Sequence, residues 1–320
     1  MKIVVLGAGA LGCALGSVLT EGGHEVWLVN RHQAQVDAMN HHGLKVREDG
    51  VDRFVKVKAA STCAGVDLRS GPVDLLIVLV KSFHTREAIE SAKPVLDKGT
   101  VVLSLQNGLG HEEVLSAVVG QARVVAGKTY AGGVMLGTGH ISAGTKGKDT
   151  HIGELDGQVT ERVTHIARVF NEAGLLTSVS NNIMGTMWDK LLVNVATGAL
   201  SGITQLNYGE LYQLPELEAC AVAAVEEAMA VAKGHNIALS VTDPRQPWLK
   251  ASAGLPYEFK ASMLQSLEKG SVTEIDFVNG AVVLWGARLG IPTPVNQTLV
   301  ACMKGIERHL TRPPATEEIA

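Results

Sequence analysis

Residues 2–12 read Lys-Ile-Val-Val-Leu-Gly-Ala-Gly-Ala-Leu-Gly, and this stretch decides the fold. It begins with a short β-branched apolar run, which is typical of a parallel strand buried on both faces. The pattern Gly-x-Gly-x-x-Gly follows and leads into residues 10–21, whose apolar side chains have helical spacing. A strand, a glycine-rich turn and a helix in this order predict the first unit of a doubly wound α/β sheet.

The same alternation continues through the first half of the chain. It predicts further strands at residues 25–30, 73–80 and 101–105 and a helix at residues 85–96. Residues 128–155 are rich in glycine and predict turns and hairpins at the edge of the sheet. The first half therefore predicts a Rossmann-type domain.

The second half is helical by the spacing of its apolar residues. Helices are predicted at residues 183–200, 215–233, 257–269, 271–289 and 296–310. A chain of 320 residues with 46% hydrophobic residues is long enough for two cores. We therefore predict a Rossmann-type domain in residues 1–181 and an all-helical domain in residues 182–320. The tail at residues 311–320 is expected to fray.

The composition argues against several classes of partner. A formal net charge of -4 without a long basic run gives no electrostatic surface for nucleic acid or an anionic membrane. The four cysteines are far apart and form no Cys-x-x-Cys pair, which indicates reduced thiols in a cytoplasmic protein. No histidine pair has the spacing of metal ligands, so no metal is expected. Glycines interrupt the apolar N-terminus, and we expect no targeting segment.

The glycine-rich turn predicts a dinucleotide site. Gly7 would allow the tight turn, Gly9 would admit a pyrophosphate to the backbone, and Gly12 would seat the helix on the strand. The helix N-terminus would then stabilise the phosphate charge. The alternative is a tight turn without a ligand, but the flanking β/α alternation favours the nucleotide. The predicted phosphate-binding residues are Gly7, Ala8, Gly9, Ala10, Leu11 and Gly12.

The end of the second predicted strand bears on the choice of cofactor. NAD-selective sites place an Asp or Glu there to bind the ribose hydroxyls. This chain has Asn30 and Arg31 instead. The planar guanidinium of Arg31 could pair with a 2′-phosphate, so we predict NADP (NADPH) rather than NAD. The alternative is a solvated arginine at a strand end.

Further segments of the chain resemble the ketopantoate reductase (2-dehydropantoate 2-reductase) family. Their order and spacing are specific, and they span nearly the whole chain. The segments are Val80-Lys81-Ser82, residues 106–110 (Gln-Asn-Gly-Leu-Gly), residues 188–194 (Trp-Asp-Lys-Leu-Leu-Val-Asn), residues 273–280 (Thr-Glu-Ile-Asp-Phe-Val-Asn-Gly) and residues 290–296 (Gly-Ile-Pro-Thr-Pro-Val-Asn). The resemblance implies reduction of 2-dehydropantoate, a small 2-oxo acid, to pantoate by NADPH.

The resemblance also implies roles for individual residues. Lys190 would donate a proton to the substrate ketone, with Glu274 beside it as the second catalytic residue. The residues implied to bind the substrate are Asn194, Ser262 and Asn107. Those implied to line the cofactor are Lys81, Asn107 and Glu274. His84 stands where some relatives have glutamine, and we assign it no role.

Chemistry supports the same roles. Hydride addition to a 2-oxo acid leaves an alkoxide that must be stabilised and protonated, and a lysine ammonium suits this task. Asn194 lies four residues after Lys190 and shares its helical face, and Glu274 starts a later predicted helix. Each residue could instead have only a structural role. Lys190 would then be a surface lysine that extends its ammonium into solvent, and Glu274 a charge in the first turn of a helix. Asn107 would be a turn residue, and Ser262 a hydroxyl on a helix surface.

Two positions depart from the family pattern. Many ketopantoate reductases carry a second asparagine one turn beyond the one matching Asn194, where this chain has Gly198, and a nearby asparagine is replaced by Tyr208. These losses would leave room for a larger substrate, unless Gln205 or Asn207 supplies the bonds. The alternative functions are therefore reduction of another branched or bulkier 2-oxo acid, or an NADP-binding regulatory sensor without turnover. The amphipathic C-terminal helices could also bury the face of a homodimer.

Overall fold

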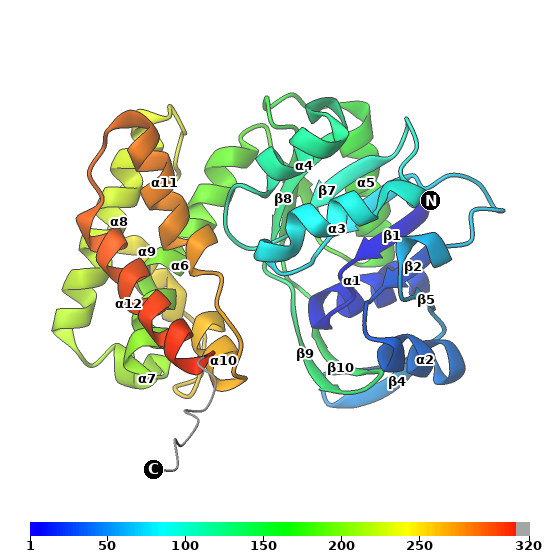
Figure 1. Cartoon of the computed structure of the whole chain (residues 1–320), viewed down its shortest axis with the longest axis horizontal. Helices are drawn as coiled ribbons and strands as arrows, with labels where there is room; N and C mark the ends of the chain where they lie inside the picture. The colour runs from blue at the N-terminus through cyan, green and yellow to red at the C-terminus, as the bar shows by residue number, and fades with distance from the viewer. Residues whose placement is uncertain (312–320) are drawn as a thin grey trace, which may run out of the picture. The chain divides into compact units, whose positions relative to one another are not determined.

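The computed structural model describes residues 1–311, which form two compact units (Figure 1). The first unit consists of Met1–Gln106 and Gly110–Thr186. The second consists of Asn107–Leu109 and the chain from Met187 onward, so the chain enters this unit twice. Apart from Thr311, the tail that we expected to fray lies outside the described residues.

The first unit is built on an eight-stranded sheet with the order β12-β11-β8-β7-β6-β1-β2-β5. The six strands β8, β7, β6, β1, β2 and β5 are parallel to their neighbours in this series. Strand β11, on the other side of β8, pairs with it in the antiparallel direction. The predicted doubly wound sheet is confirmed. Its strands are β1 (Lys2–Leu6), β2 (Glu25–Val29), β5 (Lys58–Ala60), β6 (Leu75–Val78), β7 (Val101–Ser104), β8 (Val124–Thr129), β11 (Thr150–Gly153) and β12 (Thr177–Val179).

Strand β1 is buried along its whole length because helices cover both faces of the sheet. Successive side chains of a strand point to opposite faces. Accordingly, Ile3 and Val5 pack into one core cluster and Val4 and Leu6 into the other. The helices of this unit are α1 (Ala10–Glu21), α2 (Gln33–His42), α3 (Thr85–Ser91), α4 (His111–Val119) and α5 (Glu161–Ala173).

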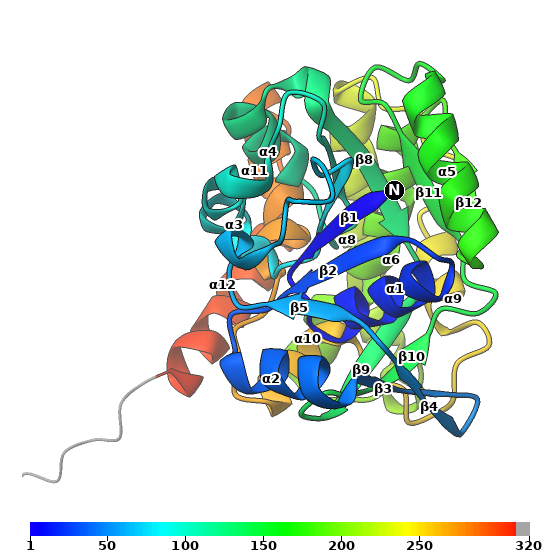
Figure 2. The ribbon, with the colours of Figure 1, turned by 90° about the vertical axis from the view of Figure 1, so that its right-hand side faces the viewer.

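A second sheet of four strands, in the order β4-β3-β10-β9, contacts helix α1 (Figure 2). The prediction that residues 128–155 form hairpins at the edge of the main sheet was therefore wrong in part. Strands β8 and β11 join the main sheet, but the β9–β10 hairpin pairs with β3. The strands of this second sheet are β3 (Leu44–Glu48), β4 (Val51–Val55), β9 (Gly132–Gly137) and β10 (His140–Gly144).

The second unit is helical, as predicted. Its elements are α6 (Ile183–Thr204, which begins in the first unit), α7 (Tyr208–Leu211), α8 (Pro215–Gly234), α9 (Gln246–Ser252), α10 (Ser262–Glu268), the short 3₁₀ helix η5 (Ile275–Phe277), α11 (Asn279–Leu289) and α12 (Pro294–Leu310). Among residues 1–311, no helix combines the length and the apolar composition needed to cross a membrane.

Two helices begin later than predicted. Residues 257–261 are not helical, because the carbonyls of Tyr257 and Phe259 accept hydrogen bonds from the backbone of Gly209 and Tyr208 instead. Residues 271–278 form a loop with one 3₁₀ turn, and α11 starts only at Asn279. Glu274 therefore lies in this loop and not at the start of a long helix.

Phe170 tests the packing of the first unit. This α5 side chain is fully buried, so Phe170→Ala should lower the free energy of unfolding of the unit by about 3–5 kcal/mol, measured by urea denaturation. Leu176 in the same unit is 50% exposed, and Leu176→Ala should change that energy by no more than about 0.5 kcal/mol. Equal losses in the two variants would contradict this packing.

Candidate active site

The first glycine of the turn after β1 cannot be replaced without moving the backbone. Gly7 has a φ of 100°, and a Cβ at this position would lie 2.5 Å from the backbone nitrogen of Val80. The amides of Gly7 and Ala8 both donate to the carbonyl of Val29, at 3.2 and 2.9 Å. The turn is thereby held against the ends of two neighbouring strands.

The other two glycines of the motif differ in their surroundings. A Cβ on Gly9 would meet no atom within 4 Å, whereas a Cβ on Gly12 would lie 2.5 Å from the carbonyl oxygen of Gly7. Gly9 is thus open to a ligand, and Gly12 lets helix α1 approach the strand. No side chain caps the N-terminus of α1, so the first-turn amides, including those of Ala10 and Leu11, can face an anion. These features fit a pyrophosphate.

The end of β2 brings together Arg31 and His84, to which we assigned no role from the sequence. The Arg31 guanidinium lies 3.3 Å from Nε2 of His84, and Nδ1 of His84 lies 3.6 Å from the carboxylate of Glu87. This arrangement suits the histidine tautomer with its proton on Nδ1. Asn30, beside Arg31, donates to the carbonyl of Ala8 at 2.7 Å and so ties this strand end to the glycine turn.

A buried amide fixes the loop that carries Lys81. Gln106 donates to the carbonyl of Val80 at 2.9 Å and to the hydroxyl of Thr85 at 2.8 Å, so it binds both sides of the loop. Lys81 itself is exposed. Gln106 stands in the motif of residues 106–110, but its role could not be predicted because Val80 and Thr85 come close to it only in the folded chain.

Two buried titratable residues, His111 and Glu112, start helix α4 and were not predicted. His111 lies 3.4 Å from the buried hydroxyl of Ser82, the residue after Lys81. Burial raises the pKa of the Glu112 carboxyl above its ordinary value. His111 therefore contacts the loop that carries Lys81.

The second unit pairs Lys190 with Asn107. The Lys190 ammonium, on α6, donates to Oδ1 of Asn107 at 2.7 Å. The short segment Asn107–Leu109 is seated by Phe277, whose carbonyl accepts from the amide of Leu109 at 3.0 Å. Gly108 has a φ of 91°, and a Cβ there would lie 2.4 Å from that same carbonyl oxygen. Only glycine allows this approach, so Gly108 positions the asparagine before it.

Lys190 lies on helix α6 between residues whose side chains are buried. Trp188, Leu191 and Leu192 are fully or almost fully buried, whereas Lys190 is only half-buried. Asp189 directly precedes Lys190 on this helix. It accepts from the amide and the hydroxyl of Ser240, at 3.0 and 2.6 Å, and so holds the loop before α9.

The remaining predicted residues also lie in the second unit. Asn194 is one turn beyond Lys190 on α6 and is partly buried, and Ser262 is the exposed first residue of α10. Glu274 is partly buried in the loop before η5. This loop ends at Phe277, which seats Asn107–Leu109, so the structure brings the segments of Lys190, Asn107 and Glu274 together.

The two departures from the family pattern have apolar surroundings. A Cβ on Gly198 would lie 3.4 Å from both Sδ and Cε of Met263, so a thioether lies against this position. The hydroxyl of Tyr208 lies 3.0 Å from that of Thr197, and burial raises the pKa of the Tyr208 phenol. The tyrosine hydroxyl is therefore partnered within the protein.

Two other motif residues are structural. Asn279 donates to the side-chain oxygen of Asn296 at 3.0 Å, which joins the start of α11 to the start of α12. Glu227, on α8, accepts from the amides of Val295 and Asn296 at 2.8 and 3.0 Å. The motif ending at residue 280 and the motif at residues 290–296 therefore pack against each other.

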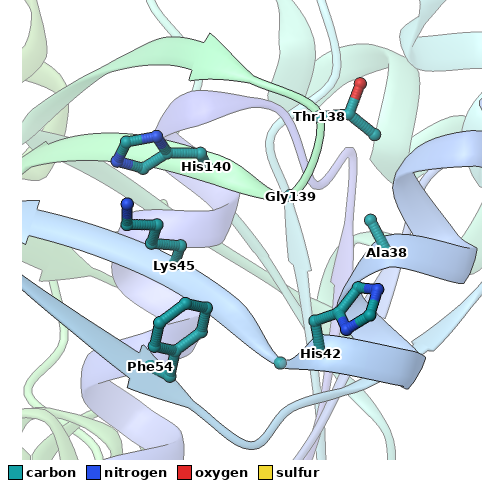
Figure 3. Close-up of a pocket in the computed structure, with 8 residues that line it drawn as sticks. Ala38, His42, Lys45, Phe54, Thr138, Gly139 and His140 are labelled. Atoms are coloured by element: carbon teal, nitrogen blue, oxygen red, sulfur yellow. The ribbon is translucent and has the colours of Figure 1, made fainter.

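A surface pocket of the first unit contains none of the predicted site residues (Figure 3). It has a volume of about 560 Å³. Lys45, on its wall, already pairs with Asp52 at 2.8 Å. The lining residues are Ala38, His42, Gly43, Lys45, Phe54, Thr138, Gly139 and His140.

Within residues 1–311, no three His, Cys, Asp or Glu side chains are close enough together to bind a metal ion.

Comparison with known proteins gives the family. Residues 3–157 match Ketopantoate reductase PanE/ApbA, and residues 182–307 match Ketopantoate reductase PanE/ApbA C terminal. A 2-dehydropantoate 2-reductase of Archaeoglobus fulgidus is 32% identical over 309 residues, which cover 97% of this chain and 99% of that protein.

Solved structures agree over nearly the full length. A PanE/ApbA family ketopantoate reductase from Ralstonia eutropha JMP134 has a TM-score of 0.87 and 35% identity, covering 98% of this chain and 100% of that one. The ternary structure of D-mandelate dehydrogenase with NADH and anilino(oxo)acetate has a TM-score of 0.88 and 26% identity, also covering 98% and 100%. These names are those of oxidoreductases. This chain belongs to the ketopantoate reductase PanE/ApbA family.

Proposed function

We propose that this protein reduces 2-dehydropantoate to pantoate with NADPH, and that Lys190 donates the proton. The observation that carries the proposal is the hydrogen bond between Lys190 and Asn107, which orients an ammonium in the unit that also carries Asn194 and Ser262. The names of the relatives, 2-dehydropantoate 2-reductase and ketopantoate reductase, support the substrate.

The first unit would hold the cofactor. The open backbone at Gly9 and the uncapped start of α1 fit the pyrophosphate of a dinucleotide. When bound, a reduced nicotinamide supplies the hydride. We propose that Lys81, Asn107 and Glu274 also line the cofactor.

The second unit would bind the 2-oxo acid and protonate it. Hydride addition to the carbonyl carbon leaves negative charge on its oxygen, and the ammonium of Lys190 would stabilise this charge and then give up a proton. Asn107 would hold the ammonium in place, and Asn194 and Ser262 would bind the substrate by hydrogen bonds. Glu274 would hold the lysine or accept from the product hydroxyl. The product is the 2-hydroxy acid, with the oxidised cofactor.

We propose NADP as the physiological cofactor because of the groups at the end of β2. Arg31 and His84 lie 3.3 Å apart, where the 2′-phosphate of NADP would bind, and no carboxylate follows β2 to bind an unmodified ribose. Nε2 of His84 would accept from the Arg31 guanidinium and so hold it in place for the phosphate. The D-mandelate dehydrogenase structure with NADH supports a nicotinamide cofactor, and the proposal of NADP rests on Arg31 and its surroundings in this chain.

A second candidate substrate is a bulkier 2-oxo acid. Met263 lies against Gly198, and the Tyr208 hydroxyl is bound to Thr197, so the wall that carries an amide in many relatives is apolar here. D-mandelate dehydrogenase, whose structure contains anilino(oxo)acetate, is a relative that binds an aromatic 2-oxo acid derivative. An apolar wall favours such a side chain because no buried polar group is left without a partner.

We also propose that the protein acts in the cytoplasm. The cysteines of the described chain, Cys13, Cys63, Cys220 and Cys302, are all free thiols, as expected in a reducing compartment.

Replacement of the proposed proton donor should abolish most of the activity. Lys190→Ala should lower kcat with 2-dehydropantoate by about 10²- to 10⁴-fold, because the alkoxide loses its proton source. The dissociation constant of NADPH, measured by nucleotide fluorescence, should not change. Lys250→Ala removes an exposed lysine of the same unit and should leave kcat unaltered. An active Lys190→Ala enzyme would exclude this lysine as the donor.

Arg31 should decide between the two nicotinamide cofactors. Arg31→Ala should raise the KM for NADPH by about 10- to 100-fold, because a charge-assisted hydrogen bond to the 2′-phosphate is lost. His84→Ala should raise it less, and neither variant should change the KM for NADH. Arg86→Ala, an exposed arginine on α3, is the control. A parallel rise for both cofactors would refute a 2′-phosphate site.

The pocket wall at Gly198 should set substrate preference. Gly198→Asn should raise the ratio of kcat/KM for 2-dehydropantoate to that for phenylglyoxylate by about tenfold, because it adds an amide and displaces Met263. If the wild-type enzyme already rejects phenylglyoxylate completely, the second candidate substrate class is wrong.

A further inference from the structure

A buried carboxylate on the last helix binds the residue next to Glu274. Glu307, on α12, is only 5% exposed. Its Oε1 accepts from the amide and from the hydroxyl of Thr273, both at 2.6 Å. The Thr273 hydroxyl in turn accepts from the amide of Ile275 at 3.2 Å. One carboxylate oxygen therefore fixes the backbone on both sides of Glu274.

The same helix also holds the far side of the loop. Lys304 lies one turn before Glu307 and pairs with Asp276 and, at 3.3 Å, with Oε2 of Glu307. The lysine compensates part of the charge of the buried carboxylate, and the Thr273 groups satisfy its other oxygen. A buried charge is costly without such partners, so this arrangement resists movement.

The loop continues into the contact that seats Asn107. Phe277 follows Asp276 directly, and its carbonyl oxygen accepts from Leu109 and closes over Gly108. Asn107 then accepts from Lys190. Each of these contacts lies within the second unit. An unbroken series of contacts therefore leads from Glu307 to the ammonium of Lys190.

We propose that Glu307 is a positioning residue for the reaction. Its carboxylate holds the loop of residues 273–277 so that Glu274 and Asn107 keep Lys190 in the orientation for proton transfer. Glu307 touches neither substrate nor cofactor in this account. The proposal rests on the proposed function, in which Lys190 is the proton donor.

Thr273 provides the cleanest test, because its hydroxyl can be removed at almost constant volume. Thr273→Val should lower kcat by about 10- to 100-fold, since displacement of catalytic groups by about 1 Å has effects of this size. Thr273→Ser keeps the hydroxyl and should restore kcat. Glu307→Gln leaves one acceptor oxygen and puts an amide NH2 against either Lys304 or Thr273, so it should also lower kcat, and in each variant the KM for NADPH should change less than kcat.

Glu227→Gln is a matched control for a purely structural effect. Glu227 accepts from two backbone amides at the opposite end of α12, at 2.8 and 3.0 Å, as Glu307 binds Thr273 at its own end. This control should lower the melting temperature but should leave kcat and its pH profile unaltered. In Thr273→Val and Glu307→Gln the alkaline limb of the kcat profile, which reports the proton donor, should move.

Amide hydrogen exchange tests the link without turnover. Exchange at Leu109 and Ile275 should be faster in Glu307→Gln than in the wild type, and it should be unaltered in Glu227→Gln. Unchanged exchange at these amides, or an equal loss of kcat in both glutamine variants, would overturn the proposal. If the wild type reduced no 2-oxo acid, the proposed function would fail, and so would the positioning role of Glu307 in that reaction. Faster exchange would then show only that the loop is held as described.

Discussion

The chemistry proposed for this protein depends on one hydrogen bond, from the ammonium of Lys190 to Oδ1 of Asn107. A lysine side chain is flexible, and an ammonium becomes a directed proton donor only when a partner fixes it. Asn107 can do so because Gly108 lets the backbone close on Phe277 without a Cβ in the way. The position of the proton donor is therefore set by backbone contacts of a short segment, which belongs to the second unit although the first unit surrounds it in the sequence.

Neighbouring residues of one motif serve different purposes. Lys190 carries the proposed chemistry, whereas Asp189 before it binds the loop at Ser240. Glu274 is a proposed site residue, whereas Thr273 before it binds Glu307. In both cases a polar residue that fixes the backbone stands beside the residue proposed to act. This arrangement limits the movement of the acting side chain, because the residue beside it is hydrogen-bonded to another element of the same unit.

The parts of the fold that follow from local sequence could be predicted, and the parts that depend on distant partners could not. The first βα unit was predicted because strand burial, the glycine turn and helical spacing are all properties of residues 2–21. The second sheet was missed although Asp49-Gly50, both with positive φ, is a hairpin signal, because β3 pairs with β10 far along the chain. The late start of α11 and the pairing of Arg31 with His84 likewise depend on tertiary contacts. The site residues came from motifs, whereas the partners of their supports, Gln106 and Glu307, are set by the tertiary structure.

The most direct test of the account is a crystal structure with NADP and a 2-oxo acid bound. In this structure Nζ of Lys190 should lie about 2.6–3.2 Å from the 2-oxo oxygen while it still donates to Asn107, since a proton donor must reach the atom that it protonates. A structure in which another side chain contacts this oxygen, and Lys190 is turned away from the substrate, would contradict the account.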